Sequence, residues 1–353
     1  MTTTWEAAAT EATATHPHAA LVMTNGEITA DRDRWHACRR ALITASDIAA
    51  CCGLAPPEYG SPWSVYAEKV TGQQIKRENA AMQRGKALEP EIRQMLARDR
   101  PEIQLTEGGL YCSRERPWQA ATLDNVGWDT SADQELGPGV AESFPVELKS
   151  DATGDGYNAS AGVVPLHYYA QALWQMDVWG ADRVLVPVLA VMPWRLILVT
   201  ITRSADTDHD IAIMRQQARI MLERVSDEDP PPIDWKPATG RALRFVSSDL
   251  EPVSVRVPVE LARRRAAVKA AQKRIRERDG LVTNELLARM GNATWAHAID
   301  PATGEEVRVC SRSQYDHTSY DTEALRNDWP AAAAATERKT PVDKLSGGSW
   351  GQR

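Results

Sequence analysis

The chain has 353 residues, of which 43% are hydrophobic and 25% are charged, and its formal net charge is −7. These proportions are ample for a packed globular core, and the length suggests about two domains of roughly 150 residues each. A nucleic-acid-binding protein is more often basic, so the net charge argues mildly against that class, although a local basic patch is sufficient for binding.

The chain has five cysteines, and none of them forms a Cys-x-x-Cys pair. This spacing excludes a zinc finger, and the odd number fits a reducing compartment better than a disulfide framework. Only Cys310 lies downstream of the acidic motif described below, which argues against an iron–sulfur cluster, because cluster thiolates usually lie close together. The N-terminus does not resemble a signal peptide and no apolar stretch reaches membrane-spanning length, so we expect a soluble, cytoplasmic protein with no membrane partner.

In chain order, residues 1–30 are small and polar, and we expect a flexible N-terminal segment. Ser46 is predicted to cap a short helix. A longer helix is predicted over residues 79–98, where apolar side chains recur near helical spacing. Strands are predicted at residues 109–112, 119–124 and 145–149, with a polar loop at about 129–143.

The second half begins with a predicted helix over residues 166–179. Residues 184–191 and 196–201 are predicted to form a hairpin of central strands, because both stretches are almost continuously apolar. A helix follows near residues 211–225, and the proline-rich segment 227–232 suggests a boundary. We therefore predict four parts: a flexible segment 1–30, a core 31–230, a C-terminal extension 231–330 and a flexible tail 331–353.

The most informative pattern is Asp124 followed by Glu147-Leu148-Lys149. In a strand the side chains alternate between faces, so Glu147 and Lys149 would point the same way and Leu148 into the core. Mg²⁺ prefers hard oxygen ligands, which Asp124 and Glu147 would supply, with Mn²⁺ as a substitute. Lys149 would then orient or activate a water molecule and stabilise charge developing on a phosphate.

The same pattern has a simpler interpretation. A short acidic motif of this kind occurs by chance in many chains, and Glu-x-Lys in a strand is commonly a solvated face. The apolar neighbours Val146 and Leu148 argue against a generic polar strand. The following helix also brings Tyr168, Gln171 and Gln175 near one face, although this is equally expected of ordinary amphipathic packing.

From residue 33 to about residue 225 the chain resembles the lambda exonuclease and YqaJ-like viral recombinase family, within the PD-(D/E)XK nucleases. Six short motifs, each weak alone, occur in the order typical of that family: Trp35-His36-x-x-Arg39, Ile43-Thr44-Ala45-Ser46, Gly85-Lys86-x-x-Glu89, Ala121-Thr122-Leu123-Asp124, Glu147-Leu148-Lys149 and Tyr168-x-x-Gln171.

The resemblance implies a role for each matching residue. Asp124, Glu147 and the backbone carbonyl of Leu148 would bind metal, with Lys149 as the catalytic lysine. Glu89 would bind metal directly or through water. The resemblance also implies that Gln171 helps to position the attacking water or the scissile phosphate.

The resemblance further implies that Arg39, Ser46 and Thr122 form a pocket for a 5′-terminal phosphate. Such a pocket is physically reasonable, because Arg39 offers a planar, permanently charged fork and Ser46 a hydroxyl near a helix N-terminus. The simpler alternative is that Arg39 pairs with a surface carboxylate and that Ser46 only caps its helix. For Ser46 both interpretations are compatible.

Two positions depart from the family's pattern. Asn125 stands where a glycine usually follows the motif aspartate, and asparagine tolerates positive φ. Gln175 stands where the wider superfamily often has a tyrosine, which leaves the detail of substrate positioning open. The basic stretch from Arg263 to Arg278 would contact DNA or a partner, or form a solvated helix face, and we favour the solvated face.

Together these features predict an α/β fold with a PD-(D/E)XK nuclease core, in which helices flank a central mixed sheet, and a helical C-terminal extension. The predicted function is Mg²⁺-dependent 5′-to-3′ exonuclease activity on duplex DNA ends that leaves 3′ single-stranded tails for phage-type recombination. The resemblance implies a homotrimer and a single-strand annealing protein as partner. Three alternatives stay open: a related endonuclease or nickase, a non-catalytic DNA-end-binding subunit, and a restriction-type or repair nuclease.

Overall fold

The computed structural model describes residues 16–75, 80–129, 143–248, 254–314 and 322–336. The chain divides into two compact units, Met1–Leu250 and Glu251–Arg353. The polar loop predicted at about 129–143 lies almost entirely outside the described residues. None of the described helices combines the length and the apolar character that a membrane-spanning segment needs.

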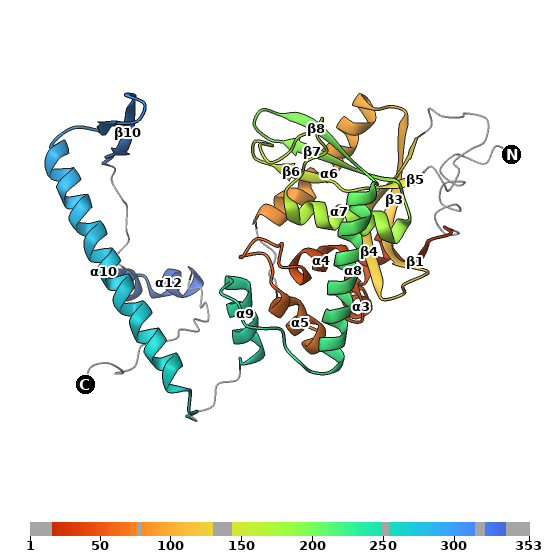
Figure 1. Ribbon diagram of the computed structural model, residues 1–353, viewed down its shortest axis with the longest axis horizontal. Coiled ribbons are helices and arrows are strands. Elements are labelled where there is room, and N and C mark those ends of the chain that lie inside the picture. The colour runs from red at the N-terminus through yellow and green to blue at the C-terminus, as the bar shows by residue number, and fades with distance from the viewer. Residues whose placement is uncertain (1–15, 76–79, 130–142, 249–253, 315–321, 337–353) are drawn as a thin grey trace. The chain divides into compact units, whose positions relative to one another are not determined.

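The first unit is built on a mixed sheet of eight strands (Figure 1). The strands are β1 (Ala19–Thr24), β2 (Ile43–Thr44), β3 (Ile103–Ser113), β4 (Gln119–Asp129), β5 (Ser143–Val146), β6 (Lys149–Asp151), β7 (Arg183–Ala190) and β8 (Arg195–Thr202). Strands β1, β3, β4 and β5 form an antiparallel series, whereas β5 and β6 both run parallel to β7. The parallel step requires a crossover, which the helix between β6 and β7 provides.

Helices flank this sheet. They are α2 (Asn25–Ala30), α3 (Arg32–Arg40), α4 (Ala45–Cys51), α5 (Pro62–Thr71), α6 (Ala80–Asp99), α7 (Leu166–Trp179), α8 (Ala205–Ser226) and α9 (Pro237–Val246). The crossover helix α7 packs against β3, β4, β5 and β7 and also contacts α4 and α8. Nine of its residues are buried, and it ends at Gly180, whose φ of 73° is the left-handed conformation that glycine adopts most easily. Helix α6 contacts the sheet through β3, β6, β7 and β8.

The structure confirms the predicted α/β class with a mixed sheet flanked by helices, and the predicted helix 166–179 coincides with α7. The hairpin is also present, as β7 and β8. However, β8 pairs only with β7 among the described strands, so its prediction as a central strand is wrong. The half-burial of Leu196, Ile197 and Leu198 reflects that edge position.

Two predicted boundaries differ from the structure. Residues 19–30, expected to be flexible, form β1 and α2, because β1 pairs antiparallel with β3. At the other end the first unit continues past residue 230 to include α9, which packs on α5. Thr239 Oγ1 on α9 donates a hydrogen bond of 2.8 Å to Ser61 Oγ at the N-terminus of α5. The proline-rich segment is therefore a connection within the first unit.

The second unit contains the predicted helical extension. Its elements are α10 (Val259–Met290), the hairpin β9 (Trp295–Ile299) and β10 (Glu306–Ser311), α11 (Thr322–Asp328) and α12 (Pro330–Thr336). The hairpin was not predicted, and α12 occupies the start of the expected flexible tail. All charged residues of α10 except the half-buried Arg265 are solvent-exposed, and some form local ion pairs such as Lys273–Glu277, as the solvated-face interpretation expects.

Candidate active site

The central sheet is interrupted at the acidic motif. Strand β5 ends at Val146, which pairs with Leu185, and β6 resumes at Lys149, which pairs with Val188 on the same strand β7. Between them the N–H of Leu148 donates a hydrogen bond of 2.9 Å to Asp124 Oδ2 on β4. The single strand predicted over 145–149 is therefore wrong, and its interruption is what brings the Asp124 carboxylate against the motif backbone.

Three side chains hold the Glu147 carboxylate, which is itself buried. Lys149 Nζ and Gln171 Nε2 both donate to Oε1, the latter over 2.5 Å. Gln175 Nε2 donates to Oε2. Gln175 is wholly buried, and its own Oε1 has no hydrogen-bond partner within the described residues. The position that departs from the wider superfamily's tyrosine thus still contacts the motif glutamate.

Burial and charge set the protonation states of this site. Burial, together with the nearby Glu147 carboxylate, raises the pKa of Asp124 to about 8, although Lys149 opposes the shift. Burial lowers the pKa of Lys149, but Glu147 and Asp124 outweigh it, so the net shift is upward. Lys149 therefore stays an ammonium ion at neutral pH, and its Nζ lies 4.7 Å from the centroid of the Tyr168 ring.

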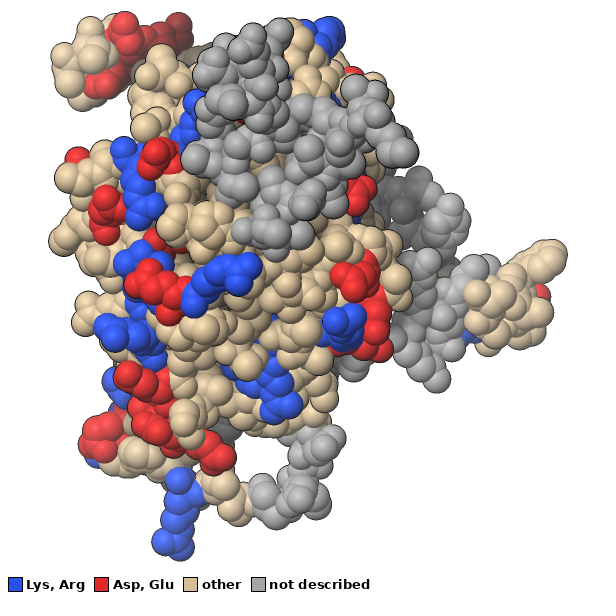
Figure 2. Space-filling model, turned by 90° about the vertical axis from the view of Figure 1, so that its right-hand side faces the viewer, with Lys and Arg blue, Asp and Glu red and all other residues tan. Residues whose placement is uncertain are grey.

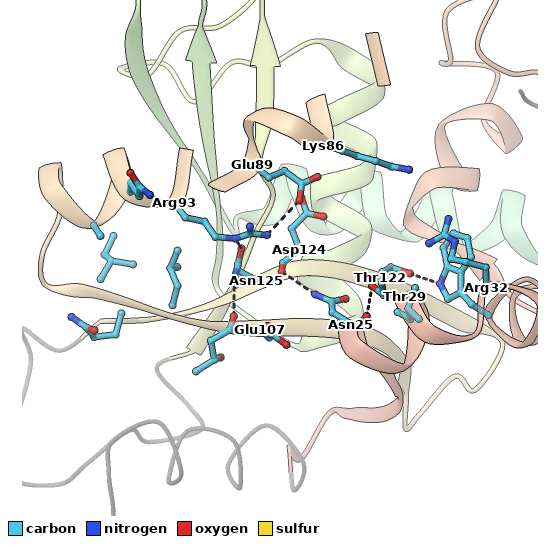
Figure 3. Close-up of a pocket in the computed structure, with 18 of the residues that line it drawn as sticks. Asn25, Thr29, Arg32, Lys86, Glu89, Arg93, Glu107, Thr122, Asp124 and Asn125 are labelled. Carbon is cyan, nitrogen blue, oxygen red and sulfur yellow. Dashed lines mark hydrogen bonds and ion pairs between the residues drawn. The ribbon is translucent and has the colours of Figure 1, made fainter. Parts of the chain in front are cut away.

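Glu89 approaches this site from α6 (Figure 3). Its Oε2 lies 3.4 Å from Arg93 Nη2 one turn later on the same helix. Arg93 Nε in turn donates to Asn125 Oδ1 over 2.8 Å, and Asn125 Nδ2 donates to the carbonyl of Thr106 over 3.0 Å. Asn125 lies within β4 and is not among the described residues with positive φ. Its side chain, rather than an unusual backbone conformation, explains its place in the structure.

Gly108 lies behind Asp124 in the sheet. The β3–β4 register pairs Glu107 with Asn125 and Gly109 with Leu123, so Gly108 stands opposite Asp124. A Cβ atom added to Gly108 would lie 2.0 Å from the carbonyl oxygen of Leu123. Because the carbonyl belongs to the backbone of β4, the clash could be relieved only by moving the strand that carries Asp124.

Arg39 and Ser46 lie together, as predicted. Arg39 Nη2 donates to Ser46 Oγ over 2.6 Å and to Thr44 Oγ1 over 3.0 Å. Ser46, however, does not cap its helix: α4 begins at Ala45, its N-cap is Thr44, and both Thr44 N and Thr44 Oγ1 donate to Asp47 Oδ2. Thr44 takes the cap position because it still has extended backbone dihedrals, whereas Ser46 is already inside the first turn. The Ser46 hydroxyl is thereby available to Arg39.

Thr122 does not contact Arg39 in the described structure; Trp35 lies between them. Trp35 Nε1 donates to Thr122 Oγ1 over 3.4 Å, and the Arg39 guanidinium carbon lies 4.4 Å from the centroid of the Trp35 ring. Stacking on the indole fixes the plane of the guanidinium. The three predicted residues are thus brought into one neighbourhood by a fourth, whose role could not be inferred from its place in the first motif.

Asp47 pairs with both Arg39 and Lys69. It is buried, and its Oδ2 lies 2.8 Å from Lys69 Nζ while its Oδ1 lies 3.6 Å from Arg39 Nη2. Burial raises the pKa of Asp47, but the charges of Lys69 and Arg39, with hydrogen bonds from Lys69 and Thr44, outweigh it and lower the pKa to about 2. A depressed pKa in the folded protein means that the charged carboxylate stabilises the fold.

Replacing Asp47 by asparagine should therefore lower the free energy of unfolding by an amount that depends on pH. The stabilisation by the carboxylate is fully present above the unfolded-state pKa of about 4 and is lost as pH falls through the folded-state pKa of about 2. Urea unfolding of wild type and Asp47→Asn between pH 2 and pH 7 measures the difference. A difference that stays constant down to pH 2 would contradict the assignment.

Most of the predicted site residues line one cleft of about 510 Å³, although Arg39 and Thr122 do not. Those that reach it are Ser46, Glu89, Asp124, Glu147, Leu148, Lys149 and Gln171. They come from α4, α6, β4, the β5–β6 interruption and α7. Arg39 is joined to this cleft through its hydrogen bond to Ser46. Segments far apart in the sequence therefore converge on one surface.

The chemistry of the donors fits a hard divalent cation. Within the described part of the chain no three His, Cys, Asp or Glu side chains are gathered as a metal cage. Mg²⁺, however, is commonly held by one or two carboxylates and keeps several water molecules. Glu147 is buried and Asp124 is half-buried, and burial with the charge of Glu147 raises the pKa of Asp124. A cation bound by both carboxylates would offset this excess of negative charge.

Sequence reasoning missed three contributors to the site. Arg93 stands four residues after Glu89, a spacing that places both on one helix face and is the signal that would have found it. Lys69 is a buried lysine, and no pattern around it indicates a partner so distant in sequence. Trp35 was noted only as part of a motif.

The elements around the site form one core. Its parts occur in the order α6, β3, β4, β5, α7 and β7, with Asp124 on β4 and Glu147 and Lys149 at the interrupted strand. Residues 34–182 match the family model of the YqaJ-like viral recombinase domain. This segment, which is less than half of the chain, is similar to that domain.

Three solved structures similar to the chain are structures of two exonucleases. An alkaline exonuclease from Laribacter hongkongensis is 22% identical, with a TM-score of 0.43 over 56% of this chain and 94% of that one. LHK-Exo in complex with dAMP is 21% identical, with a TM-score of 0.44 over 61% and 98%. A phage-related exonuclease from Haemophilus somnus 129PT is 13% identical, with a TM-score of 0.39 over 53% and 96%. A comparison with curated proteins gives no match.

Proposed function

We propose that the protein is a Mg²⁺-dependent exonuclease that degrades one strand of duplex DNA from a 5′ end and leaves a 3′ single-stranded tail for recombination. The observation that carries the proposal is the convergence of Asp124, Glu147 and Lys149 with Gln171 in one cleft, beside the Arg39–Ser46 pair. The YqaJ-like domain supports the nuclease class. Mn²⁺ would substitute for Mg²⁺, because both accept oxygen ligands.

Asp124 and Glu147 would hold the cation, with the Leu148 carbonyl and Glu89 as further oxygen donors. The bound cation would supply a Lewis acid and a water molecule of lowered pKa. Lys149 keeps its proton on Nζ and stabilises the negative charge that develops on the scissile phosphate. Gln171, fixed by its bond to Glu147, orients the water or the phosphate with its amide.

Arg39 and Ser46 would bind the 5′-terminal phosphate. The guanidinium is fixed in plane by Trp35 and in direction by Ser46 and Thr44, so it loses little freedom when an anion binds. A grip on the terminal phosphate next to the hydrolytic carboxylates gives the protein a reason to begin at ends. This pocket, rather than the metal site, separates an exonuclease from an endonuclease of the same fold.

A strongly basic surface is not required for this activity. On the face drawn in Figure 2, the Lys and Arg side chains of the described residues are interspersed with Asp and Glu. Binding would then depend on local contacts in the cleft, and on the trimeric ring and the single-strand annealing partner that the resemblance implies. Both the ring and the partner belong to the proposal.

The test compares linear duplex DNA bearing 5′-phosphate or 5′-hydroxyl ends, and closed circular duplex, each with Mg²⁺. Wild type should degrade the phosphorylated ends fastest and leave closed circles intact. Cutting of closed circles at a similar rate would instead indicate an endonuclease or nickase. Binding without cleavage would indicate an end-binding subunit, and a sequence-specific pattern of cuts a restriction-type nuclease.

Replacing Arg39 by glutamine should remove the preference for phosphorylated ends. A hydrogen bond to a charged group contributes roughly 1.5–3 kcal/mol, so kcat/KM on 5′-phosphate ends should fall by about tenfold to a hundredfold. The value on 5′-hydroxyl ends should change little. Arg34→Gln is the matched control, because Arg34 lies on the same helix and pairs with Glu27 at the surface. Equal losses on both kinds of end would contradict the pocket.

A further inference from the structure

A second and larger cavity, of about 1070 Å³, adjoins the catalytic cleft (Figure 3). Its walls are formed by α2, α3, α6, β3 and β4. Lys86, Glu89 and Asp124 line both this cavity and the catalytic cleft, so the two lie next to each other at the proposed metal site. We refer to the larger cavity as the strand channel. A chain passing over Asp124 from the catalytic cleft would enter it directly.

Arg93 is held in a fixed orientation on the wall of the strand channel. Its Nε is bound to Asn125 Oδ1, and its Nη2 lies at the longer distance of 3.4 Å from Glu89 Oε2. Asn125 is itself only 4% exposed and is anchored to the Thr106 carbonyl. A guanidinium has five N–H donors, and these contacts use two of them. The remaining donors are on Nη1 and Nη2, the outer end of the side chain.

A second arginine lines the same channel from another element. Arg32 is the first residue of α3, and its guanidinium carbon lies 4.1 Å from the centroid of the Trp35 ring. Trp35 also contacts Arg39, so the same indole serves the proposed terminal-phosphate pocket and the wall of the channel. Figure 3 shows Arg32 and Arg93 on separate elements along the channel, with Thr122 and Asp124 between them.

We propose that the strand channel binds the sugar–phosphate backbone of the DNA strand next to the scissile bond, and that Arg93 and Arg32 each contact one of its phosphates. The inference rests on the proposed nuclease function and extends it to residues outside the six motifs. Planar guanidinium groups suit phosphate oxygens, and two anchored arginines lose little freedom on binding. A purely structural Arg93–Glu89 pair on one helix face would need neither the buried Asn125 nor a cavity.

The salt dependence of DNA binding separates a phosphate contact from a structural role. Each phosphate neutralised on duplex DNA contributes about 0.9 to the slope of log K against log salt concentration, and on single strands about 0.7. The probe is a 5′-phosphorylated linear duplex, with Ca²⁺ in place of Mg²⁺, at several salt concentrations. Arg93→Gln and Arg32→Gln should each reduce the slope by about 0.7–0.9 and weaken binding several-fold at low salt.

Two matched controls are available in the chain. Arg98 lies on α6 like Arg93 but pairs with Asp99 at the surface, and Arg34 lies on α3 like Arg32. Neither lines the strand channel. Arg98→Gln and Arg34→Gln should leave the slope unchanged. Arg93→Lys, which keeps the charge, should keep the slope of wild type.

The results that would overturn the inference are specific. Unchanged slopes in Arg93→Gln and Arg32→Gln would show that these arginines do not neutralise phosphates, and equal reductions in the two controls would show only a general effect of net charge. If Arg93→Gln does not fold, Arg32→Gln decides alone, because Arg32 is an exposed residue at the start of its helix. A wild-type protein that neither binds nor hydrolyses DNA would instead defeat the proposed function itself.

Discussion

Replacing Lys149 by methionine should lower the rate of DNA hydrolysis by about 10²–10³-fold and leave DNA binding nearly unchanged. Removing one preorganised electrostatic stabiliser of a transition state has an effect of about this size. Lys149 meets the requirement, because its raised pKa keeps it charged and its contacts with Glu147 and Tyr168 hold it in place. Methionine preserves most of the volume of the side chain, so the change chiefly removes charge.

Single-turnover hydrolysis of a phosphorylated duplex with Mg²⁺ measures the rate of hydrolysis. The affinity for DNA is measured separately, with Ca²⁺ in place of Mg²⁺. Lys273→Met is the control for loss of a positive charge, since Lys273 is an exposed residue of α10 that pairs with Glu277. The control should hydrolyse DNA at the rate of wild type. A Lys149→Met protein that retains half of the wild-type rate would remove Lys149 from the catalytic step.

The largest expected effect on stability comes from Asp177. Its carboxylate is 4% exposed and accepts a hydrogen bond of 2.6 Å from Gln119 Nε2 on β4. Arg215 of α8 binds both carboxylate oxygens, and Arg116 and Arg203 lie 3.6 Å and 3.7 Å away. The buried Asp177 carboxylate therefore links α7 to β4, to α8 and to the end of β8. Its negative charge also offsets the repulsion between the three nearby guanidinium groups.

Asp177→Asn should lower the free energy of unfolding by about 3–5 kcal/mol, the usual cost of leaving buried partners uncompensated. Asp208→Asn is the matched control, because Asp208 pairs with Arg203 at the surface, where one ion pair contributes about 0–1 kcal/mol. Urea unfolding midpoints at a constant m-value compare the two variants. Equal, small decreases in the free energy of unfolding of both variants would show that Arg215 can turn toward solvent without destabilising the fold.

The sequence was most informative where one physical pattern dominates. The buried helix α7 and the hairpin β7–β8 were predicted from the sequence, the hairpin because both of its stretches are almost continuously apolar, and the order of the short motifs indicated the family. Alternating strand faces placed Glu147 and Lys149 on one side, and the family resemblance implied that Asp124 and Gln171 join them.

Other features depend on contacts between distant segments. At the break between β5 and β6, the N–H of Leu148 donates a hydrogen bond to Asp124, and nothing in the local sequence marks this break. Thr44 rather than Ser46 is the N-cap of α4. The N–H of Thr44 donates to Asp47 Oδ2, and the hydroxyl of Ser46 accepts a hydrogen bond from Arg39. Residues 19–30 resemble a polar tail but become ordered by pairing with β3, whose free edge cannot be recognised from the tail itself.

The packing of Gly108 opposite Asp124 limits which amino acids the chain can carry at position 108. An active-site aspartate is expected to tolerate no substitution. Gly108, which stands opposite Asp124 and has no side chain, is restricted in the same way. Every other amino acid at position 108 carries a Cβ atom, and that atom would lie 2.0 Å from the Leu123 carbonyl oxygen. Position 108 is therefore as intolerant of variation as a catalytic residue, although it takes part in no chemistry.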